Sequence, residues 1–90
     1  MRSKTYHELE RMVRVFSNHR RIQILELLKR KPELSLQEIA TILDINFKTA
    51  SEHVRRLAIA GLVLKRSAGN SVRHKLTTRA ESILKFLRTL

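Results

Sequence analysis

The spacing of apolar residues changes at Gly61, and this change limits the fold more than any other feature of the sequence. Before Gly61, apolar residues recur every three to four positions, as they do along one face of an α-helix. Residues 62–64 and 71–76 instead form two short β-prone runs around Ala-Gly-Asn at residues 68–70, a pattern typical of a hairpin. We therefore expect a mostly helical chain with one two-stranded hairpin.

Five helices are expected around this hairpin. Signals of the form Ser/Thr-x-x-Glu begin three of them, at Thr5, Ser35 and Thr78, and Asn18 can cap another. Residues 29–32, Lys-Arg-Lys-Pro, end the second helix, because cations suit a helix C-terminus and proline stops the run. The expected helices span residues 5–17, 18–30, 35–43, 47–60 and 78–90.

The predicted order is four helices, two strands and a final helix, with no linker or repeat between them. One domain over residues 1–90 therefore accounts for the whole chain. The third and fourth helices are joined by a three-residue turn at residues 44–46. Their size and spacing are those of a helix-turn-helix, in which the second helix enters the major groove of DNA.

Positive charge is concentrated in the middle third of the chain. The 90 residues contain 19 Lys and Arg against 8 Asp and Glu, which gives a formal net charge of +11. Residues 46–79 hold eight of these bases and one acid, and therefore +7 of the total. Such clustering is typical of a site for a polyanion. On charge alone, nucleic acid, an anionic membrane surface and a solvated polar face all stay open.

The outward face of the fourth helix carries polar side chains that can reach DNA. Ala50, Val54 and Leu57 share the inward face. The first residues of such a helix reach deepest into the groove, and the neighbouring hairpin is also basic, which favours a duplex held by both elements. The candidate DNA-binding residues are Lys48, Thr49, Ser51, Glu52, His53, Arg55 and Arg56 on helix 47–60, and Lys65, Arg66, Asn70, Arg73 and Lys75 on wing 65–75.

Several segments resemble the ArsR-type winged-helix repressors, and the resemblance covers nearly the whole chain. Residues 16–25 read F-S-N-H-R-R-I-Q-I-L and are similar to the start of that family's second helix, L-A-x-P-x-R-x-x-I-L, without its proline. Residues 50–54 (A-S-E-H-V) and 60–63 (A-G-L-V) are similar to its V-S-x-H-L and A-G-L-V. Gly69 and the Leu-Thr pair at residues 76–77 match its wing glycine and closing L-T.

The resemblance implies a mostly α winged helix-turn-helix of order α-α-α-α-β-β-α. It also implies a homodimer that represses transcription by binding operator DNA through helix 47–60 and the wing. Two residues depart from the pattern: Phe47 stands where Gln is usual, and Glu52 where Arg or His is usual. The family's base contacts therefore do not carry over at these positions. Phe47 can either touch a thymine methyl group or pack over Leu43.

Many relatives sense metals, but their ligands are missing here. The relatives' stretch E-L-C-V-C-D-L corresponds to residues 33–39, which read E-L-S-L-Q-E-I, and neither Ser nor Gln replaces a thiolate. Their alternative site uses Asp and His on the last helix, where only Glu81 is present. The histidines lie on different elements without ligand spacing: His7, His19, His53 and His74. We therefore expect no metal and no cofactor.

The first and last helices each carry an apolar stripe that one small subunit has little interior to bury. Pairing each of these helices with its symmetry mate would cover both stripes, so we expect a homodimer formed by helices 5–17 and 78–90. The alternative is that both stripes fold back on their own core. The candidate interface residues are Tyr6, Leu9, Met12, Val13, Phe16, Ile83, Phe86, Leu87 and Leu90.

Other classes of function have less support. No nucleophile has a base partner at a recognisable spacing, so an enzyme is not expected. A winged helix that binds RNA, the ribosome or a protein partner is the alternative. RNA modules usually interleave aromatic and basic residues, and residues 62–76 contain no aromatic residue. The apolar run at residues 58–64 is too short to span a bilayer, so we expect a cytoplasmic protein, on the nucleoid when DNA is bound, with no membrane partner.

Overall fold

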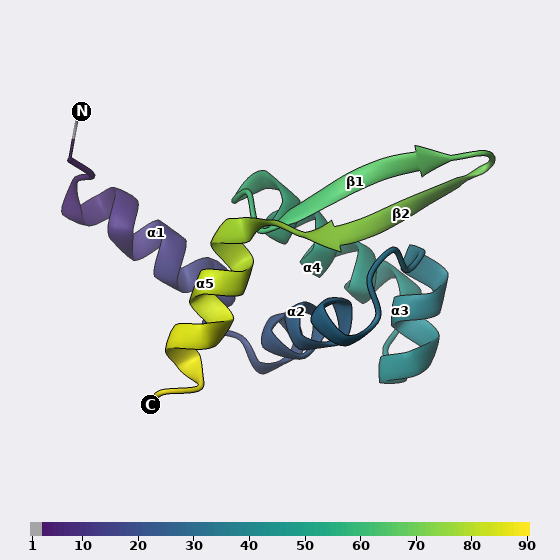
Figure 1. The fold of residues 1–90 in the computed structure, drawn as a ribbon, viewed down its shortest axis with the longest axis horizontal. Coiled ribbons are helices and arrows are strands. Elements are labelled where there is room, and N and C mark those ends of the chain that lie inside the picture. The colour runs from purple at the N-terminus through teal and green to yellow at the C-terminus, as the bar shows by residue number, and fades with distance from the viewer. Residues whose placement is uncertain (1–2) are drawn as a thin grey trace.

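The structure, a computed structural model, describes residues 3–90, and residues 1–2 of the expected domain lie outside the described part. Figure 1 shows five helices and one hairpin. The order α-α-α-α-β-β-α confirms the expected winged helix-turn-helix fold class. The elements are α1 (Tyr6–Phe16), α2 (His19–Arg30), α3 (Leu36–Leu43), α4 (Phe47–Ile59), β1 (Val63–Ala68), β2 (Ser71–Leu76) and α5 (Thr78–Leu87).

Local capping explains where four of the helices begin. The side chains of Thr5 and Ser35 accept hydrogen bonds from the backbone three residues on, and a Glu carboxylate at that position accepts one in return. Both expected capping boxes are thereby confirmed. Asn18 and Asn46 cap α2 and α4 through their side-chain oxygens. Each of these starts is encoded within a few residues of sequence.

The last helix begins at Thr78 as expected, but its N-cap is Thr77 and not Thr78. The hydroxyl of Thr77 accepts a hydrogen bond from the Ala80 backbone N–H and donates one to the Gly61 carbonyl, at 2.7 Å. This second contact joins α5 to the end of α4, so tertiary structure selects Thr77 as the cap. The helix also ends at Leu87 instead of continuing to residue 90.

The hairpin contains a two-residue turn. Ala68 and Ser71 are paired, and Gly69 between them has a φ of +64°, as the first central position of a type II′ turn requires. A third short segment joins this sheet through an isolated antiparallel bridge between Leu34 and His74: the His74 N–H donates to the Leu34 carbonyl, and the Glu33 N–H donates to the His74 carbonyl. The sequence pattern did not indicate this bridge, which ties the chain before α3 to the base of the wing.

The hydrophobic core surrounds α2, which contacts α1, α3, α4, α5 and β2. Because α2 is covered from several sides, Ile24, Leu25, Leu27 and Leu28 are all buried. Ile22 on the same helix is only half-buried. The remaining core side chains come from the other elements: Ile39, Ala40, Ala50, Val54, Leu57, Leu62, Val63, Leu76, Ala80 and Leu84.

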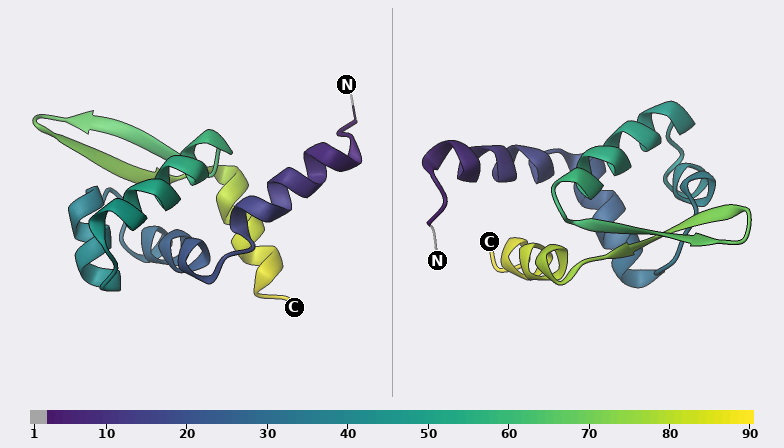
Figure 2. Two further views of the ribbon diagram at one scale, coloured as in Figure 1. Left: turned by 180° about the vertical axis from the view of Figure 1, so that it is seen from behind. Right: turned by 90° about the horizontal axis from the view of Figure 1, so that it is seen from above.

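Two elements project from this core in opposite directions. In Figure 1 the hairpin points away on one side and α1 on the other, and the views in Figure 2 agree. None of the residues of α1 is buried, although Met12, Val15 and Phe16 near its C-terminal end pack against the core. Within residues 3–90, no helix has the length and apolar character needed to cross a membrane.

Candidate nucleic-acid interface

The turn between α3 and α4 sets the direction of α4. Asp44 takes a left-handed conformation, φ 52° and ψ 52°, and its N–H donates to the carbonyls of Ala40 and Thr41, which ends α3. Two residues later, the Asn46 side chain accepts the N–H groups of Lys48 (2.8 Å) and residue 49 (3.3 Å). One helix therefore ends and the next begins within three residues.

The two faces of α4 divide as the sequence predicts. Ala50, Val54 and Leu57 are at most 1% exposed and pack into the core. On the other face Ile59 is 74% exposed. The remaining outward side chains are the exposed Lys48, Thr49, Arg55 and Arg56 and the half-buried Ser51, Glu52 and His53. The expected contact residues of α4 thus share one side of the helix, and their contacts with DNA stay a prediction.

Glu52 holds the two arginines of α4. Arg55 donates two hydrogen bonds to its carboxylate, at 2.9 and 3.1 Å, and the Arg56 Nε donates a third at 2.9 Å. The hydrogen bonds and charge of Arg55 come first among the causes that lower the pKa of Glu52 to about 2, and Arg56 adds to them. The carboxylate is therefore ionised at neutral pH and offsets part of the positive charge on the outward face.

His53 faces the start of α2. Its Nδ1 accepts a hydrogen bond from the Arg21 Nε at 3.1 Å, and the same guanidinium donates to the Val15 carbonyl at 3.0 Å. Burial, followed by the charge of Arg21, lowers the pKa of His53. The expected DNA-binding role of His53 is untested, but its contact with Arg21 is a structural one. Arg21 lies far from α4 in sequence, so residue spacing gave no sign of this link.

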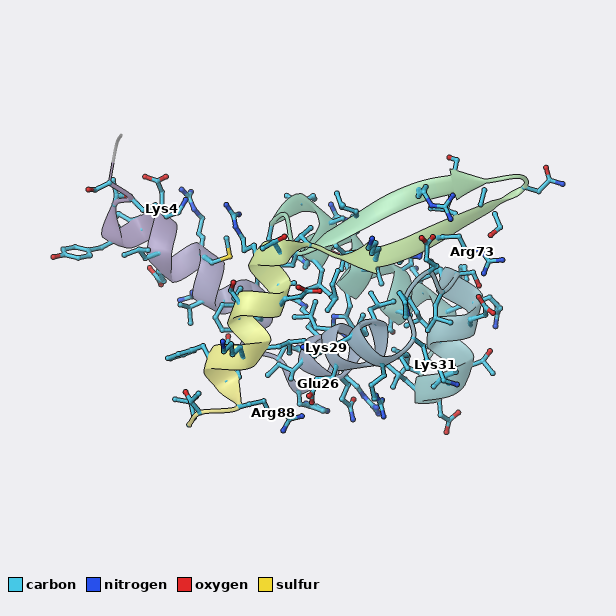
Figure 3. All side chains as sticks on the ribbon, viewed as in Figure 1. Lys4, Glu26, Lys29, Lys31, Arg73 and Arg88 are labelled. Carbon is cyan, nitrogen blue, oxygen red and sulfur yellow. The ribbon has the colours of Figure 1, made fainter. Side chains whose placement is uncertain are left out.

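The arginines and the lysines of the wing differ in their surroundings. Arg66 and Arg73 are direct cross-strand partners, an unfavourable position for two like charges. Arg66 is paired with Glu33 at 2.6 Å, and Arg73 with Glu38 at 2.8 Å, so each charge has a carboxylate partner before α3 or in its first turn. Figure 3 shows Arg73 beside the start of α3. The remaining expected wing contacts, Lys65, Asn70 and Lys75, are exposed.

Phe47 is the residue whose role the sequence left open between packing over Leu43 and a thymine contact. It begins α4 and is 50% exposed, so both roles stay predictions. Leu43, its expected partner, is itself only half-buried. The first turn of a helix lies at the edge of the core, where a side chain is covered on one side only. Phe47 lies seven residues before Val54, almost two helical turns away on the same side of α4, so its exposed half lies at the N-terminal edge of that side.

Residues considered as possible metal ligands instead make structural contacts within the protein. Ser35 caps α3, and the Gln37 side chain donates to the Thr41 hydroxyl at 3.1 Å. His74 is 3% exposed and its Nδ1 lies 2.9 Å from the Leu34 carbonyl; burial lowers the pKa of His74. Over residues 3–90, no three His, Cys, Asp or Glu side chains come together where a metal ion could be held.

Comparison with solved structures identifies close matches to the whole fold. The homodimeric winged helix-turn-helix DNA-binding domain of a possible ArsR-family transcriptional regulator from Mycobacterium bovis is similar at 25% identity, with a TM-score of 0.81 over 99% of this chain and 88% of that chain. HlyU from Vibrio cholerae is similar at 27% identity, with a TM-score of 0.81 over 98% of this chain and 96% of that chain. MarR, at 18% identity, shares the fold with a TM-score of 0.78 over 89% of this chain and 61% of that chain.

No curated protein sequence matches the chain significantly. A family match does cover residues 17–63, from the start of α2 to the beginning of β1, and the description of that family is winged helix-turn-helix DNA-binding. This segment contains α3, α4 and the turn between them, which form the helix-turn-helix. The chain belongs to the winged helix-turn-helix DNA-binding family.

Proposed function

We propose that this protein is a sequence-specific transcriptional repressor of the ArsR type, which binds operator DNA as a homodimer and has no enzymatic activity. The observation that carries the proposal is the outward face of α4, where polar and basic side chains stand opposite a fully buried face. A helix of this kind after a three-residue turn reads base edges in the major groove. The wing residues then contact the backbone or the minor groove: Lys65, Arg66, Asn70, Arg73 and Lys75.

The proposed dimer rests on apolar surface that a single subunit leaves uncovered. On α1, Tyr6 is 90% exposed, and Leu9 and Val13 are about half exposed. At the C-terminal end, Phe86 is 59% exposed and Leu90 85% exposed. The half-buried Met12, Phe16, Ile83 and Leu87 complete the two stripes. The similar Mycobacterium bovis domain is homodimeric, which supports the same assembly here.

Dimerisation gives the recognition helices a defined separation. Two helices roughly 34 Å apart read successive major grooves on one side of a duplex, so the operator should contain two half-sites about 10 base pairs apart, centre to centre. We propose that residues 1–90 act as one DNA-binding unit in which α1 and α5 set this separation. The ArsR type is favoured by the quoted sequence motifs and by the Mycobacterium bovis relative.

The test is a footprint of the purified protein on the region upstream of its own gene. We expect a protected pseudo-palindrome, and binding that is at least 1,000-fold tighter than to a shuffled duplex of equal length, as typical specificity ratios imply. Transcription from the same promoter in vitro should fall as the site fills. Equal affinity for the natural and the shuffled duplex contradicts sequence-specific binding, and an unchanged or raised transcript level contradicts repression.

A further inference from the structure

A basic groove of about 540 Å³ lies between α1 and the C-terminal half of α4. Its apolar lining includes Met12, Val15 and Ile59. Around this lining the groove has one carboxylate, Glu8, and six cationic side chains: Lys4, Arg11, Arg14, Arg21, Arg55 and Arg56. Four of the six lie outside residues 46–79, the segment to which the charge pattern assigned DNA binding: Lys4, Arg11, Arg14 and Arg21.

Some cations of the groove are paired with a carboxylate and others are not. Arg14 pairs with Glu10 at 2.9 Å, and both α4 arginines share Glu52. The Glu8 carboxylate accepts the backbone N–H of the residue that caps α1, at 3.1 Å. Within residues 3–90, neither Lys4, which precedes α1, nor Arg11 on α1 takes part in an ion pair.

The groove adjoins α4, the helix proposed to enter the major groove of DNA. In Figure 1 the wing and α1 extend to opposite sides of α4, and in the right view of Figure 2 the C-terminal ends of α1 and α4 lie together. Arg55 and Arg56 belong both to the groove and to the outward face of α4. Basic surface therefore continues past α4 on the side away from the wing, which is the side of the proposed dimer axis.

We propose that this groove is a second phosphate-binding surface, in which Lys4 and Arg11 contact the DNA backbone between the two half-sites. The proposal rests on the proposed function, since it assigns a further part of the same DNA complex. Lys4 precedes the N-cap of α1 and Arg11 lies within the helix, so the two cations stand at different levels along the groove. A phosphate backbone carries charges in series and can contact both.

The experiment compares salt dependence of operator binding for the full chain and two matched double variants. The first variant, Lys4→Ala with Arg11→Ala (the α1 variant), removes one charge just before α1 and one on it. The control, Lys29→Ala with Lys85→Ala, removes two charges that line a different groove, between α2 and α5. Figure 3 places Lys29 well away from Lys4. Each lost phosphate contact lowers the slope of log K against log salt by about 0.9, so we expect the α1 variant to lose about 1.8 per protomer and the control to keep the wild-type slope.

A third variant separates charge from packing. Lys4→Arg with Arg11→Lys keeps both charges, and its slope should equal that of the wild type. Sedimentation velocity checks that every variant has the wild-type oligomeric state. If the wild type binds no duplex, the proposed function fails. If the wild type binds and the α1 alanine variant keeps the slope of the α2–α5 control, only this further inference is overturned.

Discussion

Replacing Glu52 by Gln should make the protein bind DNA with higher affinity and lower sequence selectivity. In the free protein the Glu52 carboxylate accepts hydrogen bonds from Arg55 and Arg56 and stays ionised, since its pKa is about 2. Gln has nearly the same shape but carries no charge. The substitution therefore leaves two guanidinium groups on the outward face without their carboxylate, while the buried face of α4 is unchanged.

The size of the effect follows from the number of arginines released. If both turn to phosphates, the slope of log K against log salt for a random-sequence duplex should steepen by about 1.8 per protomer. Between 50 and 300 mM salt, that difference amounts to about a 25-fold greater loss of affinity per protomer for the variant than for the wild type, or about 630-fold for a dimer in which both protomers bind. Affinity at low salt should rise for random DNA more than for the operator, because phosphate contacts carry no sequence information.

Fluorescence anisotropy titrations at several salt concentrations measure this slope directly. The matched control is Glu26→Gln, which removes the partner of Arg88 and changes the net charge equally, between α2 and α5. The control should keep the wild-type slope. A Glu52→Gln slope equal to that of Glu26→Gln would refute the reasoning, because it would mean that the arginines of α4 do not contact phosphates in the complex.

Four further outcomes are expected. Lys48→Ala should change the ranking of operator sequences in a competition assay, whereas Arg73→Ala should weaken all duplexes about equally; equal losses for both variants would contradict this division between base and backbone contacts. Leu87→Glu should give a monomer in sedimentation velocity that binds a half-site weakly and loses the full operator, and a wild type that already sediments as a 10.5 kDa species at micromolar concentration would remove the dimer. Burial lowers the pKa of His74, so the unfolded chain gains a proton before the folded one does as pH falls below about 6.5. The free energy of unfolding should therefore decrease between pH 7.5 and 5.5. Denaturant titrations should show a smaller decrease for His74→Gln. Operator affinity should be the same with zinc, cadmium, arsenite or a chelator, and a reproducible tenfold shift with stoichiometric metal would overturn that expectation.

Features that depend on neighbouring residues were predictable from the sequence. The capping boxes at Thr5 and Ser35 and the caps at Asn18 and Asn46 each lie within three residues of the groups they bind, so a short pattern contains the whole interaction. The two faces of α4 likewise follow from residue spacing alone. These local signals were enough to place the helices and to select the outward face.

Features that join distant parts of the chain were not predictable in this way. Arg66 and Glu33 are 33 residues apart, and Arg73 and Glu38 are 35 apart, so the sequence showed the wing arginines as unpaired cations. The N-cap of α5 was expected at Thr78 and lies at Thr77, because the Thr77 hydroxyl also contacts Gly61, 16 residues away in sequence. The groove between α1 and α4 has the same origin, since residue spacing does not show that Lys4 lies near Arg55.

Glu38 performs two tasks with one oxygen atom. Its Oε1 accepts the Ser35 backbone N–H at 2.8 Å, which fixes the first turn of α3, and it accepts the Arg73 guanidinium at 2.8 Å, which holds the wing. In evolutionary terms, these two parts of the protein cannot drift independently at this position. A shorter acid would reach neither partner as well, and a neutral residue would weaken both. Among relatives, the identity of residue 38 should therefore vary together with residue 73, even though neither change alters a base contact.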